Sequence, residues 1–251
     1  MLTNEKKITN EKGKKKNVKE ETKTKDFINK SNFKTFNEKN VEKMSFMQNL
    51  EIDKTFATYI TEAFLKTQED IIEREFEVNY SGSTVCSIFI LGNIIYCANV
   101  GDSRCVLGRL VKDKKIQPLS ISRDHKPSDS DEKERILNSG GRVEAFKNED
   151  NEDVGPPRVW LKDEDVPGLA MSRSIGDIVS AKVGVISSPE ISLYKISKND
   201  KFLILASDGL WEFVSNEQAV QIVSRFWLIG DADGAVDELI RIASHYWEEV
   251  R

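Results

Sequence analysis

The chain has 251 residues, of which 39% are hydrophobic and 31% charged, and its formal net charge is −5. Residues 1–45 carry thirteen lysines against seven acidic residues, so residues 46–251 are strongly acidic, with a net charge of −11. Because a nucleic-acid-binding domain presents a basic surface, this balance argues against a nucleic-acid partner. It is compatible with a group of carboxylates that metal ions neutralise.

The cysteines and the hydropathy bear on where the protein resides. Cys86, Cys97 and Cys105 lie in or beside predicted strands without the spacing of a metal knuckle. We interpret them as small buried thiols in a reducing compartment. No apolar run is long enough to cross a membrane, and the lysine-rich N-terminus lacks the apolar stretch of a secretory signal. These features predict a cytoplasmic or nuclear protein without a membrane partner.

The N-terminal part of the chain changes character near residue 45. Residues 1–45 are rich in Lys, Asn, Glu and Thr, a composition typical of a disordered tail, and we place the folded domain at residues 46–251. Apolar residues recur at i, i+3 and i+4 between Phe56 and Phe76, which predicts an amphipathic helix. A shorter helix is predicted over Val41–Leu50.

The next stretch has the pattern of strands. Ser83–Leu91 and Ile94–Val100 are separated by the turn signal Gly92-Asn93, and Gly101–Arg104 is a second tight turn before Cys105–Leu110. Three consecutive antiparallel strands predict a meander. Since its strands are apolar on both faces, we expect helices to cover one face of the sheet and a second sheet to cover the other.

The remaining elements mix helices and strands. Gly140-Gly141 ends a predicted helix at Ser130–Ser139. The other elements, in chain order, are two strands within Arg142–Leu161 around an acidic loop, a short helix over Leu169–Asp177, strands at Val183–Ser188, Glu190–Ile196 and Phe202–Ala206, and helices at Glu217–Trp227 and Ala235–Val250. This arrangement predicts an α+β fold.

One carboxylate lies at the end of a buried strand. The apolar run Phe202–Ala206 stops at Ser207-Asp208-Gly209, and Ser215 and Gln218 have the spacing of a helix capping box. An ionised Asp beside turn backbone suits a hard cation such as Mg²⁺ or Mn²⁺, which prefers oxygen ligands. For an isolated Asp-Gly, the simpler interpretation is an Asp that stabilises the turn.

Several short segments resemble the PP2C-type metal-dependent protein serine/threonine phosphatases. The segments are, in order, Gly82-Ser83-Thr84, Ala98–Arg104, Asp124–Pro127, Glu132–Ile136, Gly140-Gly141, Pro167–Asp177, Ser188–Glu190 and Leu205–Glu212. Each motif alone is weak, but the ordered set is specific. The resemblance implies a PP2C-like αββα sandwich, in which helices flank two antiparallel sheets, incomplete at both ends.

The resemblance also implies a chemistry. Members of the family hydrolyse phosphoserine and phosphothreonine with a water activated by a pair of Mn²⁺ or Mg²⁺ ions. By motif, Asp208 matches a metal-ligating Asp of the family, and Asp102 matches an Asp associated with a third, looser metal. Residues 177–188 match part of the flap beside the active site. The partners expected from the resemblance are phosphoprotein substrates or a protein partner, and we expect a monomer.

Other polar and aromatic residues of the motifs have structural interpretations. We expect Arg104 and Arg173 to join loops through ion pairs rather than to contact substrate. We expect Asp177 to stabilise a turn through its side chain, and His125 to be a loop histidine with satisfied hydrogen bonds. We interpret Trp160 and Trp211 as packing residues and His245 as a surface residue.

Part of the family's catalytic set does not match this chain. Residues 1–50 contain no Arg, no Glu-Asp pair of the family type and no Asp-Gly-His-Gly-Gly, and no Asp-Asp or Asp-Asn pair follows the last predicted helix. No catalytic residue is therefore identifiable, and Asp208 and Asp102 are the metal positions that remain. We expect an incomplete, weakly active or inactive form of a phosphatase; the alternative is a pseudophosphatase that acts as a binding scaffold.

Overall fold

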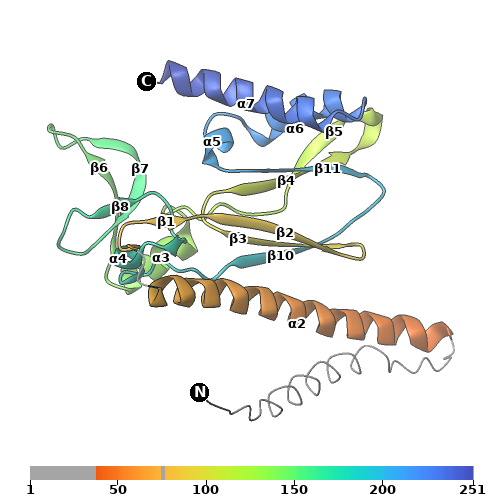
Figure 1. The fold of residues 1–251 in the computed structure, drawn as a ribbon, viewed down its shortest axis with the longest axis horizontal. Coiled ribbons are helices and arrows are strands. Elements are labelled where there is room, and N and C mark those ends of the chain that lie inside the picture. The colour runs from red at the N-terminus through yellow and green to blue at the C-terminus, as the bar shows by residue number, and fades with distance from the viewer. Residues whose placement is uncertain (1–37, 75–76, 251) are drawn as a thin grey trace, which may run out of the picture. The chain divides into compact units, whose positions relative to one another are not determined.

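The computed structural model describes residues 38–74 and 77–250 (Figure 1). These residues fall into two units, 38–52 and 53–250, and the first contributes only the N-terminal part of helix α2 (Glu38–Glu73). Residues 1–37 of the predicted tail lie outside the described residues, whereas residues 38–45 are helical. A single helix thus replaces the two predicted over Val41–Leu50 and Phe56–Phe76, and the domain boundary near residue 45 stays a prediction.

Two three-stranded antiparallel sheets form the centre of the second unit. The first sheet has the order β10–β3–β2 and the second the order β11–β4–β5. Their bounds are β2 (Val85–Leu91), β3 (Ile94–Val100), β10 (Glu190–Lys195), β4 (Arg104–Leu110), β5 (Ile116–Ser120) and β11 (Asp200–Ala206). The layer between the sheets is apolar, with Ile95 and Cys97 of β3 packed against Cys105 and Leu107 of β4.

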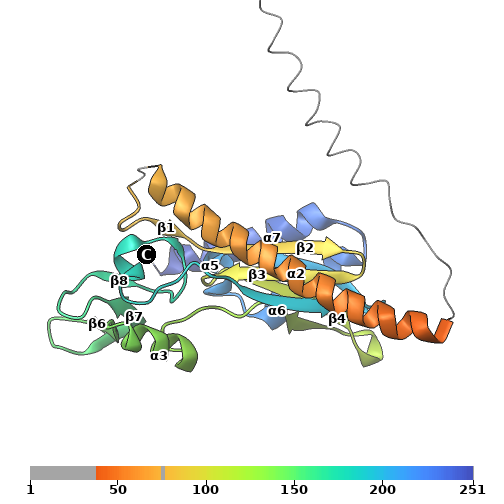
Figure 2. The same cartoon turned by 90° about the horizontal axis from the view of Figure 1, so that it is seen from below.

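Helices cover the outer faces of both sheets, as Figures 1 and 2 show. Ile60 and Phe64, four residues apart on α2, pack on Tyr96 and Ala98 of β3. Helices α6 (Asn216–Trp227) and α7 (Ala232–Glu249) cover the other sheet, where Leu239 of α7 belongs to the core. This αββα sandwich confirms the predicted fold class.

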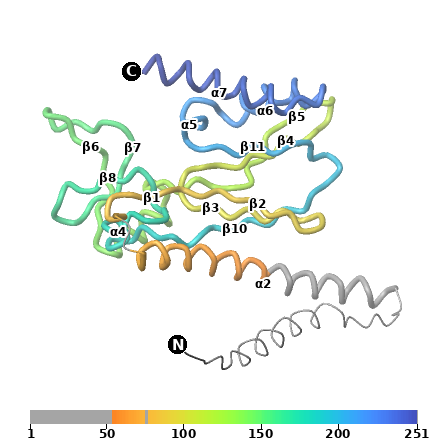
Figure 3. The backbone as a smooth tube through the Cα atoms, in the orientation of Figure 1, coloured from red at the N-terminus to blue at the C-terminus, as the bar shows by residue number. Residues whose placement is uncertain are grey.

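The predicted meander is wrong, because β3 and β4 lie in different sheets. The chain passes from one sheet to the other at residues 101–103 (Figure 3). Gly101 makes this crossing with a φ of +94°, and a Cβ there would overlap the Thr84 side chain. A tight turn between two apolar strands predicts a hairpin, but here the apolar faces of the strands pack against each other across the sandwich.

A third antiparallel sheet, of order β6–β7–β8, lies beside α3. The remaining elements are β1 (Gly82–Ser83), which pairs with β9 (Ile175–Gly176), α3 (Ser130–Asn138), β6 (Arg142–Lys147), β7 (Asp153–Trp160), β8 (Pro167–Leu169), α4 (Ile178–Ala181), α5 (Asp208–Trp211) and a 3₁₀ turn at Lys112–Lys114. Gly140 and Gly141 donate to the carbonyls of Leu137 and Ile136, so the predicted glycine cap of α3 is confirmed.

Two predicted elements in this region are wrong. Leu169–Asp177 is not helical, because its backbone groups bond to distant residues: the Ser172 N–H donates to the His125 carbonyl, and the Ser174 N–H to the Ile186 carbonyl. Val183–Ser188 forms only an isolated bridge, at Ile186, instead of a strand. Tertiary hydrogen bonds overrode the local preference of Leu169–Asp177, whereas Val183–Val185 form local turn hydrogen bonds to Ser180 and Ala181 at the end of α4.

Strand β11 lies at an edge of its sheet, as far as the described residues show. An apolar groove of about 740 Å³ runs beside it, lined by residues of β11 and α7 that include Leu205, Ile240 and Trp247.

Within residues 38–74 and 77–250, no helix combines the length and hydropathy that a membrane span requires.

Candidate functional site

The two predicted metal positions come to the same end of one strand pair. Arg104, at the start of β4, is the cross-strand partner of Ala206, at the end of β11. Asp102 precedes Arg104 by two residues and Asp208 follows Ala206 by two, so antiparallel pairing brings both acids to this end of the sheet. We call residues 102–104 and 206–208 the acidic corner.

Trp211 and Arg104 stabilise the acidic corner. The buried indole of Trp211 donates from Nε1 to the carbonyl oxygens of Arg104 (3.2 Å) and Ala206 (3.0 Å), and so joins the two strands. The Arg104 guanidinium lies over the Trp211 ring and donates two hydrogen bonds to Asp124, at 2.8 and 2.7 Å. The predicted ion-pair role of Arg104 and packing role of Trp211 are confirmed.

Asp102 is a buried carboxylate on a firmly held turn. The residue is 4% exposed, and its Oδ2 lies 2.6 Å from the Lys126 ammonium. The turn is held through Gly101. The Gly101 N–H donates to the ring nitrogen Nδ1 of His125 (3.1 Å), and the Gly101 carbonyl accepts from the backbone N–H of His125 (3.0 Å). The sequence interpretation did not assign a role to Lys126, although it lies in the motif Asp124–Pro127.

Asp208 has a different environment. It is exposed at the first turn of α5, and none of the described residues forms a hydrogen bond or ion pair with its carboxylate. An ionised carboxylate without a protein partner is available to an external cation. The structure thus places one free carboxylate and one paired carboxylate at the acidic corner.

The side-chain donors of the acidic corner are carboxylate oxygens, the chemistry that a hydrated divalent cation prefers. Carboxylate oxygens suit Mg²⁺ or Mn²⁺, and Mg²⁺ usually retains several waters when only one or two carboxylates bind it. Over residues 38–74 and 77–250, no group of three or more His, Cys, Asp or Glu side chains is arranged to hold a metal. The described residues therefore do not fit a cluster of two ions.

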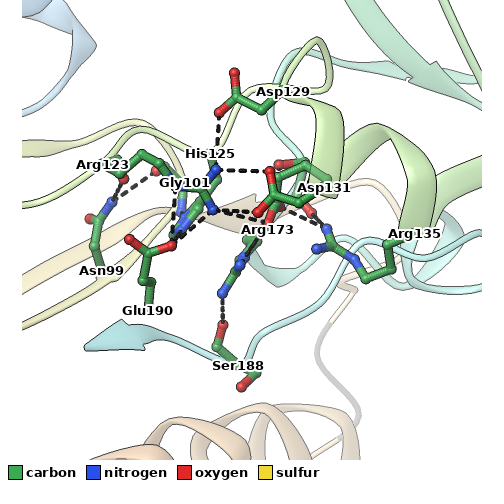
Figure 4. A network of polar contacts seen from close by, with 12 residues as sticks. Asn99, Gly101, Arg123, His125, Asp129, Asp131, Arg135, Arg173, Ser188 and Glu190 are labelled. Atoms are coloured by element: carbon green, nitrogen blue, oxygen red, sulfur yellow. Dashed lines mark hydrogen bonds and ion pairs between the residues drawn. The ribbon is translucent and has the colours of Figure 1, made fainter. Parts of the chain in front are cut away.

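A second polar centre lies around Glu132 of α3, shown in part in Figure 4. Glu132 is fully buried, and it accepts hydrogen bonds from Arg173 (2.6 Å), Arg135 (2.8 Å) and Ser172. Burial alone would raise the pKa of Glu132, but the hydrogen bonds from Arg135, Arg173 and Ser172 outweigh it and hold the pKa well below its ordinary value. We call these four residues the Glu132 cluster.

The Glu132 cluster joins segments that are distant in the sequence. Arg173 also donates to the Ser188 carbonyl, and Arg135 to the Gly184 carbonyl, so both arginines hold the segment at residues 184–188. Arg123 lies 3.6 Å from Glu132 and donates to Glu190. The expected loop-joining role of Arg173 is confirmed. A signal for Glu132 existed, since it lies one helical turn before the buried Ile136 on α3.

His125 lies between the acidic corner and the Glu132 cluster. It is fully buried, its Nδ1 accepts a hydrogen bond, and its Nε2 has no hydrogen-bond partner among the described residues. Burial, followed by the positive charge of Arg173, lowers the pKa of His125 to about 4. The histidine is therefore neutral at pH 7. The expectation of fully satisfied hydrogen bonds was wrong for Nε2.

Three further residues complete the comparison with the sequence interpretation. Asp177 is buried with a φ of +46°, and its side chain does not cap the helix α4 that follows. Burial raises the pKa of its carboxyl group, and the nearby Ser174 hydroxyl partly offsets this rise. Trp160 is buried, with its Nε1 bonded to the Glu144 carbonyl, and His245 is exposed. The packing and surface interpretations of these two are confirmed.

Comparisons with known proteins agree with this geometry. A family model described as "Protein phosphatase 2C" matches residues 6–247. The chain is 38% identical over 195 residues to "Probable protein phosphatase 2C 73" of Arabidopsis thaliana; the alignment covers 76% of this chain and 50% of the relative. It is 40% identical over 191 residues to a protein of the same description from Oryza sativa subsp. japonica, covering 73% and 43%.

A solved structure shows the same fold. The crystal structure of a serine-threonine phosphatase 2C from Toxoplasma gondii matches with a TM-score of 0.69 at 20% sequence identity, covering 90% of this chain and 70% of the other. At this identity the match concerns the fold alone. The chain spans about half the length of the curated relatives it matches.

Proposed function

Because the chain belongs to the protein phosphatase 2C family, we propose that it acts in the hydrolysis of phosphoserine and phosphothreonine in proteins, with a divalent cation at the acidic corner. The observation that supports this most is the pairing of β4 with β11, which brings Asp102 and Asp208 to one end of the sheet. A bound cation there would polarise phosphoryl oxygens and lower the pKa of a bound water.

The chain's own residues would have distinct tasks. Asp208 would bind the cation directly, because its carboxylate is exposed and free of protein partners. Asp102 would add a second, buried negative charge. Trp211 and Arg104 would keep the two strand ends in register, which holds both acids at the same end of the sheet. The oxygen donors favour Mg²⁺ or Mn²⁺ over softer metals.

A second candidate is a scaffold that binds phosphoproteins without hydrolysing them. It is favoured by the lack, over the described part of the chain, of any group of three metal-ligating side chains. A scaffold needs the fold and the flap segment but not two metal ions. The two candidates share a phosphoprotein partner and differ in turnover.

Location and assembly are also proposals. The three cysteines are free thiols, two of them buried, which supports a reducing compartment such as the cytoplasm or nucleus. We propose a monomer that contacts phosphoproteins and neither nucleic acid nor membrane.

Phosphate release from a phosphothreonine peptide by the full chain, with and without Mn²⁺, tests the proposed function. We expect weak, Mn²⁺-dependent release that Asp208→Asn lowers by about tenfold or more, since the free carboxylate of the site is lost. Glu217→Gln, at an exposed position of α6, is the matched control and should leave the rate unchanged. Peptide binding without release would favour the scaffold, and release that is insensitive to Asp208→Asn would contradict the cation site.

A further inference from the structure

The Asp102 carboxylate needs a compensating charge, because a buried ion without a partner is strongly destabilising. The cation in direct contact with it is the Lys126 ammonium, at 2.6 Å from Oδ2. Arg104 also lies in the acidic corner, but its guanidinium is engaged by both oxygens of Asp124 and by Oδ1 of Asn216. Lys126 therefore neutralises Asp102.

In this ion pair, the Asp102 side chain is fixed in place, whereas the Lys126 side chain is free to move. Asp102 follows Gly101, which is fixed by two hydrogen bonds with His125 and by a third from Asn99 Nδ2 to the Gly101 carbonyl (3.0 Å). Its side chain is 5% exposed, whereas that of Lys126 is 38% exposed. A lysine ammonium on a flexible, partly exposed stem can move into solvent. The buried Asp102 carboxylate stays in place when the Lys126 ammonium moves.

A divalent cation bound by Asp102 would have to share this carboxylate with Lys126, whose ammonium already contacts Oδ2. Two positive charges within a few ångströms repel each other strongly at a poorly solvated site. We propose that Lys126 is a tethered counter-ion that competes with the divalent cation for Asp102 and so weakens cation binding at the acidic corner. This inference rests on the proposed function, because it assumes that the acidic corner binds a cation.

The competition has a functional consequence. With Lys126 on Asp102, the buried carboxylate is neutralised without metal, and the fold does not depend on a cation. A cation binds once its concentration is high enough to displace the ammonium. Lys126 would thus determine the cation concentration at which the site fills, without contacting the phosphoprotein.

A purely structural role for Lys126 makes a different prediction. The ion pair also joins the turn at residues 101–103 to the loop at residues 124–127. If this were its only role, removing the ammonium would lower stability and leave cation affinity unchanged or weaker. Cation affinity is therefore the discriminating measurement.

The test measures Mn²⁺ binding to the full 251-residue chain by isothermal titration calorimetry and by the electron paramagnetic resonance signal of free Mn²⁺. We expect Lys126→Met to lower the Kd for Mn²⁺ by about tenfold, the effect of removing one nearby charge at a partly exposed site. Lys126→Arg, which keeps the charge, should stay near the wild-type Kd. Lys133→Met, at an exposed lysine of α3, is the matched control.

Thermal unfolding keeps the inference testable if Lys126→Met folds poorly. Without metal, Lys126→Met should have a lower Tm than the wild type, since Asp102 is left unpaired. Mn²⁺ should then raise the Tm of this variant more than that of the wild type, because tighter binding to the native state stabilises it more. The double variant Asp102→Asn with Lys126→Met should lose this extra gain.

The outcomes separate the inference from the proposed function. If Asp208→Asn weakens Mn²⁺ binding but Lys126→Met binds with wild-type affinity, the counter-ion role is overturned and the cation site stands. If neither Asp208→Asn nor Asp102→Asn alters Mn²⁺ binding, the cation site itself is overturned, and the inference with it.

Discussion

At the scale of single residues, the buried charges decide what the motifs do. Glu132 would be costly to bury alone, and two arginines and a serine hydroxyl compensate for it. His125 is buried in its neutral form, because its burial and then the nearby positive charge of Arg173 lower its pKa. Histidine is often a general acid, but a histidine that is neutral at pH 7 and inaccessible to solvent is suited to hold a turn instead.

The lowered pKa of His125 predicts a loss of stability in mild acid. The unfolded histidine titrates near 6.5 and the folded one near 4, so the unfolded state binds more protons between these values. Stability therefore falls as pH drops from 6.5 towards 4, by about 1 to 2 kcal/mol between pH 7 and pH 5. Urea unfolding at the two pH values measures this loss.

The variant His125→Asn supplies the comparison for this prediction. Its side-chain oxygen can still accept from the Gly101 N–H, but the residue no longer titrates. The pH-dependent part of the stability loss should shrink in the variant, whatever its absolute stability. An equal loss in both proteins would show that other groups cause the pH dependence.

At the scale of elements, the turn at residues 101–103 carries the chain between the two sheets and presents Asp102. Its geometry depends on Gly101, which combines a positive φ with close packing against Thr84. A residue with a Cβ at position 101 would therefore not fit into this turn without displacing Thr84. The same hydrogen bonds that shape it also position the acidic corner.

Gly101→Ala should therefore destabilise the protein by about 2 kcal/mol or more, from backbone strain and from overlap with the Thr84 methyl group. Gly92→Ala is the matched control: Gly92 has a positive φ of +61° but open space around it, so only the strain applies. Urea unfolding measures both. Thr84→Ser should partly rescue Gly101→Ala and not Gly92→Ala; equal effects at the two glycines would contradict the packing argument.

Across the whole molecule, the buried core and the exposed groove beside β11 differ in how far they shield apolar side chains from solvent. Leu239 and Ile240 are neighbours on α7, yet Leu239 is 6% exposed in the core while Ile240 is 58% exposed in the groove beside β11. The helix thus presents one apolar face to the sheet and further apolar residues to the groove.

Leu239→Ala should cost about 2 to 5 kcal/mol of unfolding free energy, because it leaves a cavity in the core. Ile240→Ala should change stability by no more than about 0.5 kcal/mol, since its side chain is already exposed. Chemical denaturation of the full chain at several protein concentrations measures both. A large cost for Ile240→Ala would contradict the exposed position of this side chain.

The family resemblance supplied the αββα arrangement and singled out Asp102 and Asp208, whereas the residue pattern alone predicted the type of most elements. Local periodicity and turn residues were sufficient for this, because strands such as β3 and helices such as α3 bury the faces that their patterns predict. Family motifs then indicated which acids lie at strand ends. The loop-joining roles of Arg104 and Arg173 also followed from the sequence.

Long-range contacts, which no local pattern contains, determine that β3 and β4 belong to different sheets, that Leu169–Asp177 is not helical, and that Lys126 pairs with Asp102. The physical reason is the same in each case. These features depend on hydrogen bonds and charges between residues far apart in the chain, and a local pattern contains no information about which distant group will satisfy a buried donor, acceptor or ion.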